Sequence, residues 1–314
     1  MERKIRIALL GECMIELRGQ LFGAMQQYFG GDTLNTAVYL ARLAADGGIE
    51  VAYATELGTD AFSDAMLRAW QEDRIDTRLV IREPGRMPGL YTIQVDETGE
   101  RTFYYWRDSS AARHYFDGAS SPLEDALDTL DALYFSGISL AVLSRHGRER
   151  LFKCAERLRA AGKQVIFDNN FRARLWTAGL EDARAWYERA FSCCDLAMIT
   201  LDDNQALYAL PDEASAIRHA CALPPDEVVI KRGAEPTLVR LAGREPITVP
   251  TFPVSKVVDT TGAGDSFAGG YLAARLQGQG PEVAARSGNK IASIVIQHAG
   301  AIIPREAMPV FFFA

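Results

Sequence analysis

The sequence lacks long apolar runs and any excess of positive charge. None of its apolar runs approaches the roughly 20 residues that a membrane helix needs, and residues 1–5 lead straight into a strand-like segment without the apolar stretch of a signal peptide. The formal net charge of −7 disfavours a broad basic surface for nucleic acid. We therefore expect a cytoplasmic protein that binds small molecules rather than nucleic acid or membrane.

Cysteine is scarce, and its spacing indicates neither a disulfide framework nor a zinc site. The chain has five cysteines, an odd number, and no two have the C-x-x-C spacing typical of zinc sites. They are Cys13, Cys154, Cys193, Cys194 and Cys221. We expect reduced, mostly buried thiols, and the sequence assigns no metal ligand.

Three common nucleotide signatures are also missing. The only Gly-Lys pair, Gly162-Lys163, is followed by glutamine, so there is no P-loop. The pair Gly262 and Gly264 lacks the third glycine of a dinucleotide fingerprint, because Phe267 stands there. The catalytic-loop residues of protein kinases are absent as well.

Short apolar runs alternate with helical patterns along the chain. Helical spacing is clear in residues 34–41 and 62–70, and strand-like runs occupy residues 5–10, 51–55, 133–136, 165–168, 196–201 and 228–231. This alternation predicts a single α/β domain over residues 1–314, with a mostly parallel central sheet and helices on both faces.

One region breaks this rhythm. Tyr91–Val95 alternates with period two, Asp96–Gly99 gives a turn signal, and residues 101–107 continue as an aromatic-rich strand. Residues 14–29 offer further strands. We favour a small β-sheet lid, formed by about residues 14–30 and 89–107, over an edge hairpin of the main sheet, because ligands bind at the carboxyl ends of parallel strands.

The segment from Asp259 to Tyr271 carries a candidate phosphate site. Helical spacing from Phe267 onward places Gly262-Ala263-Gly264 at a helix start, where unpaired N–H groups and the helix dipole bind anions. Asp265 in that first turn is expected to stay ionised and to serve as a general base. Simple helix capping by Asp265 is an equal alternative on local sequence.

A serine hydrolase is the alternative from another class. Ser266 follows Asp265, but the G-x-S-x-G pattern fails at Ala268. Such an enzyme needs a histidine to activate the serine. The histidines at positions 114, 146, 219 and 298 follow no pattern that marks one out, so this alternative is weak.

A second glycine motif, Gly30-Gly31-Asp32-Thr33-Leu34-Asn35, precedes a helix. We expect Asp32 or Thr33 to cap this helix and Asn35 to lie in its first turn. Carboxylate and amide groups suit sugar hydroxyls, because together they donate and accept hydrogen bonds. Capping with a solvated Asn35 is equally compatible with the local sequence.

Two arginines suggest an acidic substrate. Arg107 shares a strand face with Tyr105, and Arg172 follows the strand end at Asp168. A guanidinium pairs bidentately with a carboxylate, although a surface salt bridge is the commoner role of either residue.

Together these residues resemble the ribokinase (PfkB-type) family of carbohydrate kinases. Asp259–Gly270 matches the C-terminal signature of the family closely, and Gly30–Asn35 is similar to its N-terminal signature. Within the family, the chain looks most like the members that phosphorylate 2-keto-3-deoxygluconate. The segments that carry this likeness are residues 11–17, 29–35, 88–91, 99–107, 167–176 and 300–308.

The resemblance implies phosphorylation of the terminal (C6) hydroxyl of 2-keto-3-deoxy-D-gluconate by Mg-ATP. Asp265 would be the base, and the amides of Gly262, Ala263 and Gly264 would form an anion hole. The substrate residues implied are Gly31, Asp32, Asn35, Tyr91, Tyr105, Arg107 and Arg172. The nucleotide residues implied are Asn170, Asp202, Lys231, Gly233, Gly262, Gly264 and Asn289.

One departure concerns the metal. The Asn-x-x-Glu motif of the family reads Asp202-Asp203-Asn204-Gln205 here, so Gln205 supplies no charge. We expect Mg²⁺ to be held through phosphates and water rather than by a protein ligand. The resemblance also implies a homo-oligomer formed through the lid, and it leaves open a need for K⁺ and a neutral-sugar substrate such as fructose or ribose.

Overall fold

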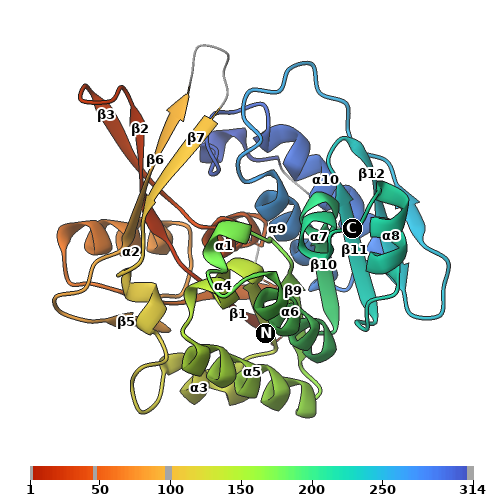
Figure 1. Cartoon of the computed structure of the whole chain (residues 1–314), viewed down its shortest axis with the longest axis horizontal. Coiled ribbons are helices and arrows are strands. Elements are labelled where there is room, and N and C mark those ends of the chain that lie inside the picture. The colour runs from red at the N-terminus through yellow and green to blue at the C-terminus, as the bar shows by residue number, and fades with distance from the viewer. Residues whose placement is uncertain (1–2, 45–47, 96–100, 310–314) are drawn as a thin grey trace.

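The computed structural model describes residues 3–44, 48–95 and 101–309. Within these ranges, nine strands form one sheet in the order β13-β12-β11-β10-β9-β8-β1-β4-β5. Figure 1 labels β1, β5, β9, β10, β11 and β12 of this sheet. In this sheet, β5, β4, β1, β8, β9, β10 and β11 are parallel to one another. At one edge, β12 is antiparallel to β11, and β13 is antiparallel to β12. Their bounds are β1 Ile5–Leu10, β4 Ile49–Leu57, β5 Val80–Arg82, β8 Ala132–Ser136, β9 Gln164–Asp168, β10 Leu196–Thr200, β11 Glu227–Arg232, β12 Glu235–Leu241 and β13 Ile247–Val249.

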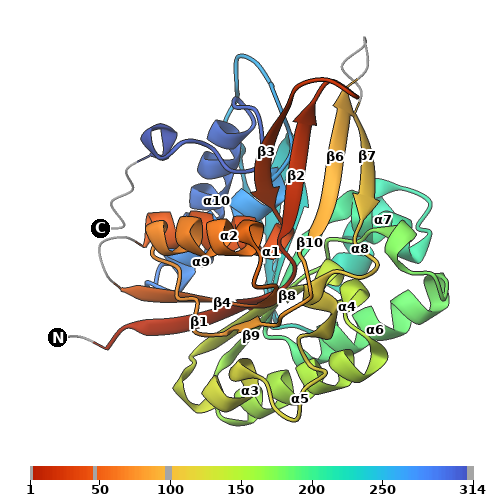
Figure 2. The same cartoon turned by 90° about the vertical axis from the view of Figure 1, so that its left-hand side faces the viewer.

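Helices cover both faces of this sheet (Figure 2). Alternate residues of each strand point to opposite faces, so Ile7 and Leu9 join one core cluster while Ala8 and Leu10 join the other. The first face packs against α1 Asp32–Leu43, α2 Ala61–Glu72, α9 Ala263–Arg275 and α10 Pro281–Val295. The second packs against α3 Pro122–Ala126, α4 Gly137–Val142, α5 Arg145–Ala160, α6 Leu180–Cys193, α7 Leu201–Tyr208 and α8 Glu213–Cys221. The expected α/β architecture is confirmed.

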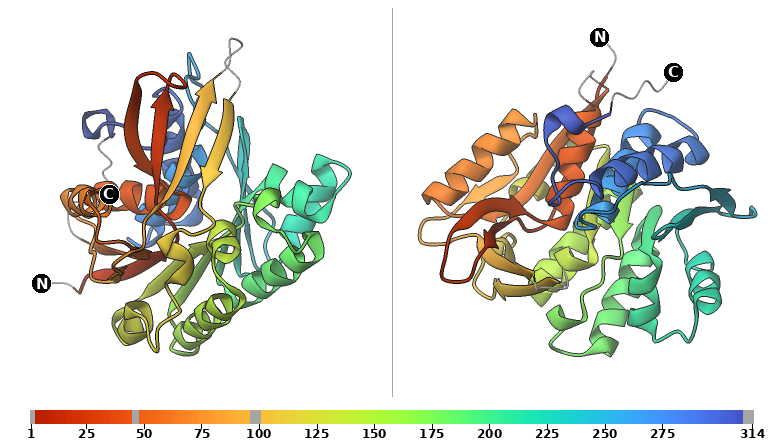
Figure 3. Two further views of the ribbon diagram at one scale, coloured as in Figure 1. Left: turned by 60° about the vertical axis from the view of Figure 1, so that its left-hand side comes forward. Right: turned by 90° about the horizontal axis from the view of Figure 1, so that it is seen from above.

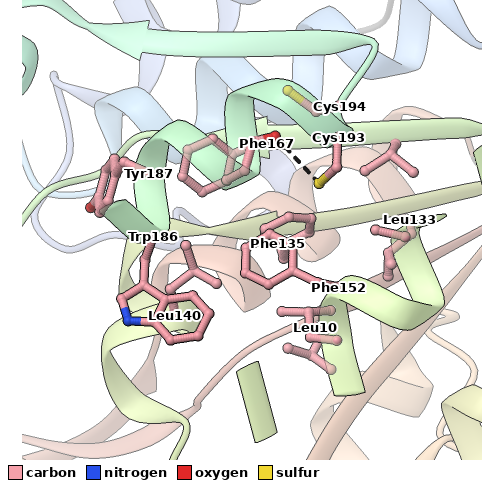
Figure 4. Packing of buried hydrophobic residues seen from close by; sticks show 14 of the residues in the cluster. Leu10, Leu133, Phe135, Leu140, Phe152, Phe167, Trp186, Tyr187, Cys193 and Cys194 are labelled. Carbon is pink, nitrogen blue, oxygen red and sulfur yellow. Dashed lines mark hydrogen bonds between the residues drawn. The ribbon is translucent and has the colours of Figure 1, made fainter. Parts of the chain in front are cut away.

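Aromatic rings fill the second face (Figure 4). The rings of Phe135 and Phe167 lie 5.2 Å apart, and the Phe167 ring meets the Tyr187 ring edge-on at 5.5 Å. Each such pair contributes about 0.5–1.5 kcal/mol beyond the area that it buries. This packing fixes the ends of β8 and β9, and β9 ends at Asp168, next to the site described below.

Four strands form a separate small sheet in the order β3-β2-β6-β7, with bounds β2 Met14–Gly19, β3 Met25–Gly30, β6 Gly89–Val95 and β7 Arg101–Trp106. It stands beyond the carboxyl ends of the main strands (Figure 3). The hairpin of β6 and β7 is antiparallel, as predicted, and the edge-hairpin alternative is wrong because the hairpin pairs with β2. The predicted turn at 96–99 lies outside the described residues.

Local predictions were wrong at two helix starts. Leu201 begins α7 rather than ending a strand. The residue before α1 is Gly31, and no side chain caps that helix, so neither Asp32 nor Thr33 is its cap. Residue 31 is glycine for a steric reason, because a Cβ there would lie 2.0 Å from the Glu12 carbonyl oxygen.

All five cysteines are described residues, and all are unpaired. Within the described ranges, no helix is long and apolar enough to cross a membrane.

Candidate active site

A cavity of about 690 Å³ lies where the small sheet meets the carboxyl ends of the main strands. Of the site residues that the sequence predicts, all but Asp202 line it. They are Gly31, Asp32, Asn35, Tyr91, Tyr105, Arg107, Asn170, Arg172, Lys231, Gly233, Gly262, Ala263, Gly264, Asp265 and Asn289. The fold therefore brings together residues from six separate segments of the chain.

The start of α9 presents backbone N–H groups to this cavity. Gly262 precedes the helix with a φ of 75°, a left-handed conformation that favours glycine. Within the described ranges, the N–H groups of Gly262 and Gly264 have no acceptor, whereas Ala263 N–H donates to the Thr260 carbonyl at 3.2 Å. Two of the three amides predicted for the anion hole are therefore open, and the third already has a partner.

The loop before α9 is anchored by Asp259. Its carboxylate accepts hydrogen bonds from Thr261 N at 2.8 Å and from Gly300 N at 2.7 Å. A Cβ at Gly262 would lie 2.8 Å from the Ala301 carbonyl oxygen. The loop is thus held against residues 300–301, which fixes the direction of its open N–H groups.

Asp265 faces the cavity and does not cap its helix. Its Oδ2 accepts a hydrogen bond from Asn35 Nδ2 at 2.8 Å. Burial, and then the nearby carboxylate of Asp32, raise the pKa of Asp265 to about 7, against the opposing effects of Asn35 and Lys231. Burial therefore opposes the effect of the helix start, which the sequence analysis expected to keep Asp265 ionised.

The start of α1 supplies polar side chains to the cavity. Asp32 Oδ2 accepts from Asn170 Nδ2 at 2.9 Å, and burial raises the pKa of Asp32. Asn35 is buried, and its Oδ1 has no hydrogen-bond partner among the described residues. A buried polar atom without a partner is costly, so Asn35 Oδ1 is well placed for a donor on a ligand.

Lys231 brings positive charge to the α9 side of the cavity. Its Nζ donates to Asp168 Oδ2 at 2.8 Å and lies 3.5 Å from the position of a Cβ at Gly264. The ammonium group is thus fixed beside the open amides, where a phosphate oxygen would meet both.

The predicted arginines line the cavity but already have acidic partners. Arg107 is buried in an ion pair with Glu12, and Arg172 Nη1 lies 3.2 Å from Asp203 Oδ2. Arg174, which the sequence analysis missed, also lines the cavity and stacks on the Tyr105 ring at 3.9 Å. Its place two residues after Arg172 was the available signal.

The acidic residue of α7 that faces the cavity is Asp203, not Asp202. Asp202 is exposed and does not line the cavity, so the structure does not support a nucleotide contact from it. Phe171 N donates to Asp203 Oδ2 at 3.1 Å, which orients that carboxylate toward the end of β9. Among the described residues, no group of three or more His, Cys, Asp or Glu residues is arranged to hold a metal ion.

The serine hydrolase alternative fails on geometry. Ser266 is fully buried, and its Oγ donates to the Ala263 carbonyl at 2.9 Å. All four histidines are described residues, and none of them lines the cavity.

A ribokinase-like fold whose cavity joins a carboxylate to open helix-start amides defines a small-molecule kinase of carbohydrate type. The sequence pattern of the pfkB family carbohydrate kinases matches residues 4–308, and this chain belongs to that family.

Known proteins resemble the chain along nearly its whole length. It is 49% identical over 308 residues to the 2-dehydro-3-deoxygluconokinase of Escherichia coli strain K12, covering 97% of this chain and 99% of that protein. The crystal structure of a PfkB protein from Polaromonas sp. JS666 has a TM-score of 0.81 at 27% identity, covering 96% of this chain and 98% of that one. A fructokinase with bound ATP from Xylella fastidiosa has a TM-score of 0.81 at 25% identity, covering 97% of this chain and 95% of that one.

Proposed function

We propose that the chain phosphorylates the terminal (C6) hydroxyl of 2-dehydro-3-deoxygluconate, also called 2-keto-3-deoxygluconate, with ATP. The observation that carries this proposal is the Asp265 carboxylate, which faces the same cavity as the open amides of Gly262 and Gly264 and the arginines at positions 107, 172 and 174. The name of the 49% identical relative from Escherichia coli supports the choice of substrate.

In this reaction, Asp265 accepts the proton of the acceptor hydroxyl as the hydroxyl oxygen bonds to the γ-phosphorus. The bond from phosphorus to the β,γ-bridging oxygen breaks, and ADP leaves with that oxygen. Gly262 N–H, Gly264 N–H and the Lys231 ammonium group stabilise the charge on the transferring phosphoryl group. A magnesium ion, when bound with ATP, neutralises further phosphate charge, and the residues near the phosphates are compatible with an ion held mainly by phosphate and water.

The two ends of the sugar acid meet different surfaces. Gly31, Asp32 and Asn35 bind the hydroxyls near Asp265. Tyr91, Tyr105, Arg107 and Arg172 bind the keto-acid end, and we add Arg174 because it has no ion-pair partner among the described residues. The nucleotide side consists of Lys231, Gly233, Asn170 and Asn289 with the open amides.

The small sheet, in this proposal, is a lid that closes over the sugar and excludes water. Its outer face carries Tyr104 and Trp106, which are 46% and 61% exposed, and it offers an apolar surface for a second copy of the chain. A homo-oligomer formed through the lid, a cytoplasmic location and a requirement for K⁺ stay predictions.

Turnover of ATP against a panel of acceptors tests the substrate. The panel contains 2-keto-3-deoxygluconate, its galactonate epimer, fructose and ribose, with formation of ADP as the readout. We expect kcat/KM for a keto-deoxy acid to exceed that for either neutral sugar by at least about 100-fold, the worth of one or two charge-assisted hydrogen bonds. Comparable turnover of fructose or ribose would instead identify a neutral-sugar kinase.

The arginines test the acidic end of the substrate separately. In Arg174→Ala and Arg172→Ala, we expect KM for the acid to rise about 10–100-fold, because each variant loses a charge-assisted contact, while KM for ATP changes little. Arg232→Ala is the matched control, since Arg232 lines the nucleotide side and pairs with Glu213. An unchanged KM for the acid in both variants would remove these two residues from the carboxylate site.

A further inference from the structure

A second cavity, of about 380 Å³, adjoins the active site, and arginines make up five of its fifteen lining residues. Five arginines and two aspartates line it, in a chain whose net charge is −7. The arginines are Arg107, Arg113, Arg145, Arg148 and Arg174. Arg107 and Arg174 also line the active site, so the two cavities share a wall.

Most of this positive charge has no neutralising partner among the described residues. Arg113, Arg145 and Arg174 make no ion pair within the part of the chain that the structure describes. Of the two aspartates, Asp182 lies 3.5 Å from Arg148, and Asp108 is exposed. Three guanidinium groups of this cavity therefore have no carboxylate partner among the described residues.

The protein fixes the guanidinium of Arg148 in place. This group stacks on the rings of Trp176 and Trp186 at 4.7 and 5.2 Å, and its Nε donates to a carbonyl of α4 at 2.6 Å. Burial, together with the like charges of Arg113 and Arg145, lowers the pKa of Arg148. The arginines are thus close enough to repel one another, and a bound anion would relieve that repulsion.

The start of α5 adds to this unfavourable arrangement of charge. Arg145 is the first residue of the helix, Arg148 lies one turn further on, and the first turn contains no acidic residue. The N-terminus of a helix favours negative charge, so cations here are unfavourable. An anion in the cavity would meet both the positive end of the helix and the arginines.

We propose that this second cavity binds a small phosphate monoester. A dianion matches several unpaired guanidinium groups better than a single carboxylate does, because each guanidinium pairs with two oxygens of a phosphate. Because Arg107 and Arg174 belong to both walls, the bound monoester competes for the side chains that hold the sugar acid and raises its KM. Binding in this cavity does not depend on which sugar the active site phosphorylates.

Calorimetric titration tests the site with glycerol 3-phosphate as the probe and glycerol as the blank. The protein is first saturated with a non-hydrolysable ATP analogue and Mg²⁺, checked by a separate titration, so that the amides of Gly262 and Gly264 are occupied. The test variant is Arg113→Gln/Arg145→Gln. The matched control is Arg68→Gln/Arg286→Gln, which removes two exposed arginines that make no ion pair in the described ranges.

We expect the wild type and the control to bind glycerol 3-phosphate equally, and the test variant to bind it at least about tenfold more weakly, the worth of one charge-assisted contact. Glycerol should give no heat of binding. Equal affinity in the test variant, or no binding to the wild type at millimolar probe, would overturn the proposal. A normal circular dichroism spectrum and melting temperature of the test variant show that weaker binding is not a failure to fold.

Discussion

The two glycine-bearing helix starts of the site, at α1 and α9, look alike in sequence and differ in space. Each helix follows a glycine without a side-chain cap, and each carries an aspartate in its first turn. At α1, the glycine is extended, with a φ of −178°, and a Cβ there would strike the Glu12 carbonyl oxygen. At α9, the preceding glycine, Gly262, has a left-handed φ of 75°, and a Cβ there would lie 2.8 Å from the Ala301 carbonyl oxygen. A Cβ at Gly264, in the first turn, would meet only Lys231 Nζ within 4 Å, at 3.5 Å, among the described residues outside its own helix backbone and its chain neighbours.

The difference shows that glycine serves two purposes here. At Gly31 it lets two backbones pack tightly, which leaves the side chains of Asp32 and Asn35 to face the cavity. At Gly264 it keeps the helix start open, so that a phosphate group has room to approach the N–H groups. This difference agrees with the proposal that the first start binds the sugar and the second serves phosphoryl transfer.

The largest expected effect is at Asp265. Asp265→Asn removes the general base while keeping the shape of the side chain, so kcat should fall by about 10²–10⁴-fold. Titration with ATP should give an unchanged affinity, which separates loss of chemistry from loss of binding. A variant within tenfold of the wild-type kcat would contradict the assignment of the base.

The matched change at the other helix start is Asp32→Asn. If α1 only binds the sugar, this variant should raise KM for the acid by about 10–100-fold, the worth of one hydrogen bond to a charged group, and lower kcat far less than Asp265→Asn does. Steady-state kinetics of the two variants side by side measure the contrast. An equal loss of kcat in both variants would contradict the proposal that α1 binds the sugar and α9 serves phosphoryl transfer.

The raised pKa of Asp265 predicts the pH dependence of the reaction. A base with a pKa of about 7 must be ionised to act, so kcat/KM should level off above pH 7 and fall about tenfold per unit well below it. The ordinary pKa of 3.8 would give a flat profile down to pH 5. A profile of kcat/KM measured from pH 5 to 9 therefore shows whether burial at the start of α9 raises the pKa of Asp265.

The raised pKa of Asp265 also predicts how the stability of the fold changes with pH. The change is opposite to that expected for a salt-bridged aspartate, whose contribution to stability increases with pH. Because folding raises the pKa of Asp265, the folded state binds more protons, and its stability falls as the pH rises from about 4 through 7. Asp265→Asn lacks this titration. The melting temperature of the variant should therefore exceed that of the wild type more at pH 8 than at pH 5.

The smallest effects concern the glycines themselves. Gly31→Ala should destabilise the fold by about 1–3 kcal/mol, because its methyl group must displace backbone. Gly264→Ala should leave the free energy of unfolding within about 1 kcal/mol, since alanine favours helix, yet raise KM for ATP. Urea denaturation together with ATP kinetics separates the two, and a similar loss of stability in both would mean that Gly264 is also a packing residue.

Part of the site could be predicted from residues that are close together in the sequence. The helix start at Gly262 followed from the spacing of Phe267 and the residues after it, and the small sheet followed from the period-two pattern at Tyr91–Val95. Such features depend on local periodicity, which survives in a single sequence. The need for glycine at position 31 could not be predicted in this way, because the Glu12 carbonyl that leaves no room for a Cβ belongs to another segment.

The sequence by itself determined the α/β alternation, the two glycine motifs and the identity of the carboxylate proposed as the base. Only the tertiary structure decided that Asp203 rather than Asp202 faces the cavity, that Arg174 joins the arginines, and that Asp265 is desolvated beside Asp32. The physical reason is the separation along the chain between the residues that interact. Helical and strand periodicity arise between residues a few positions apart, whereas burial and the proximity of charges depend on which distant segments pack together.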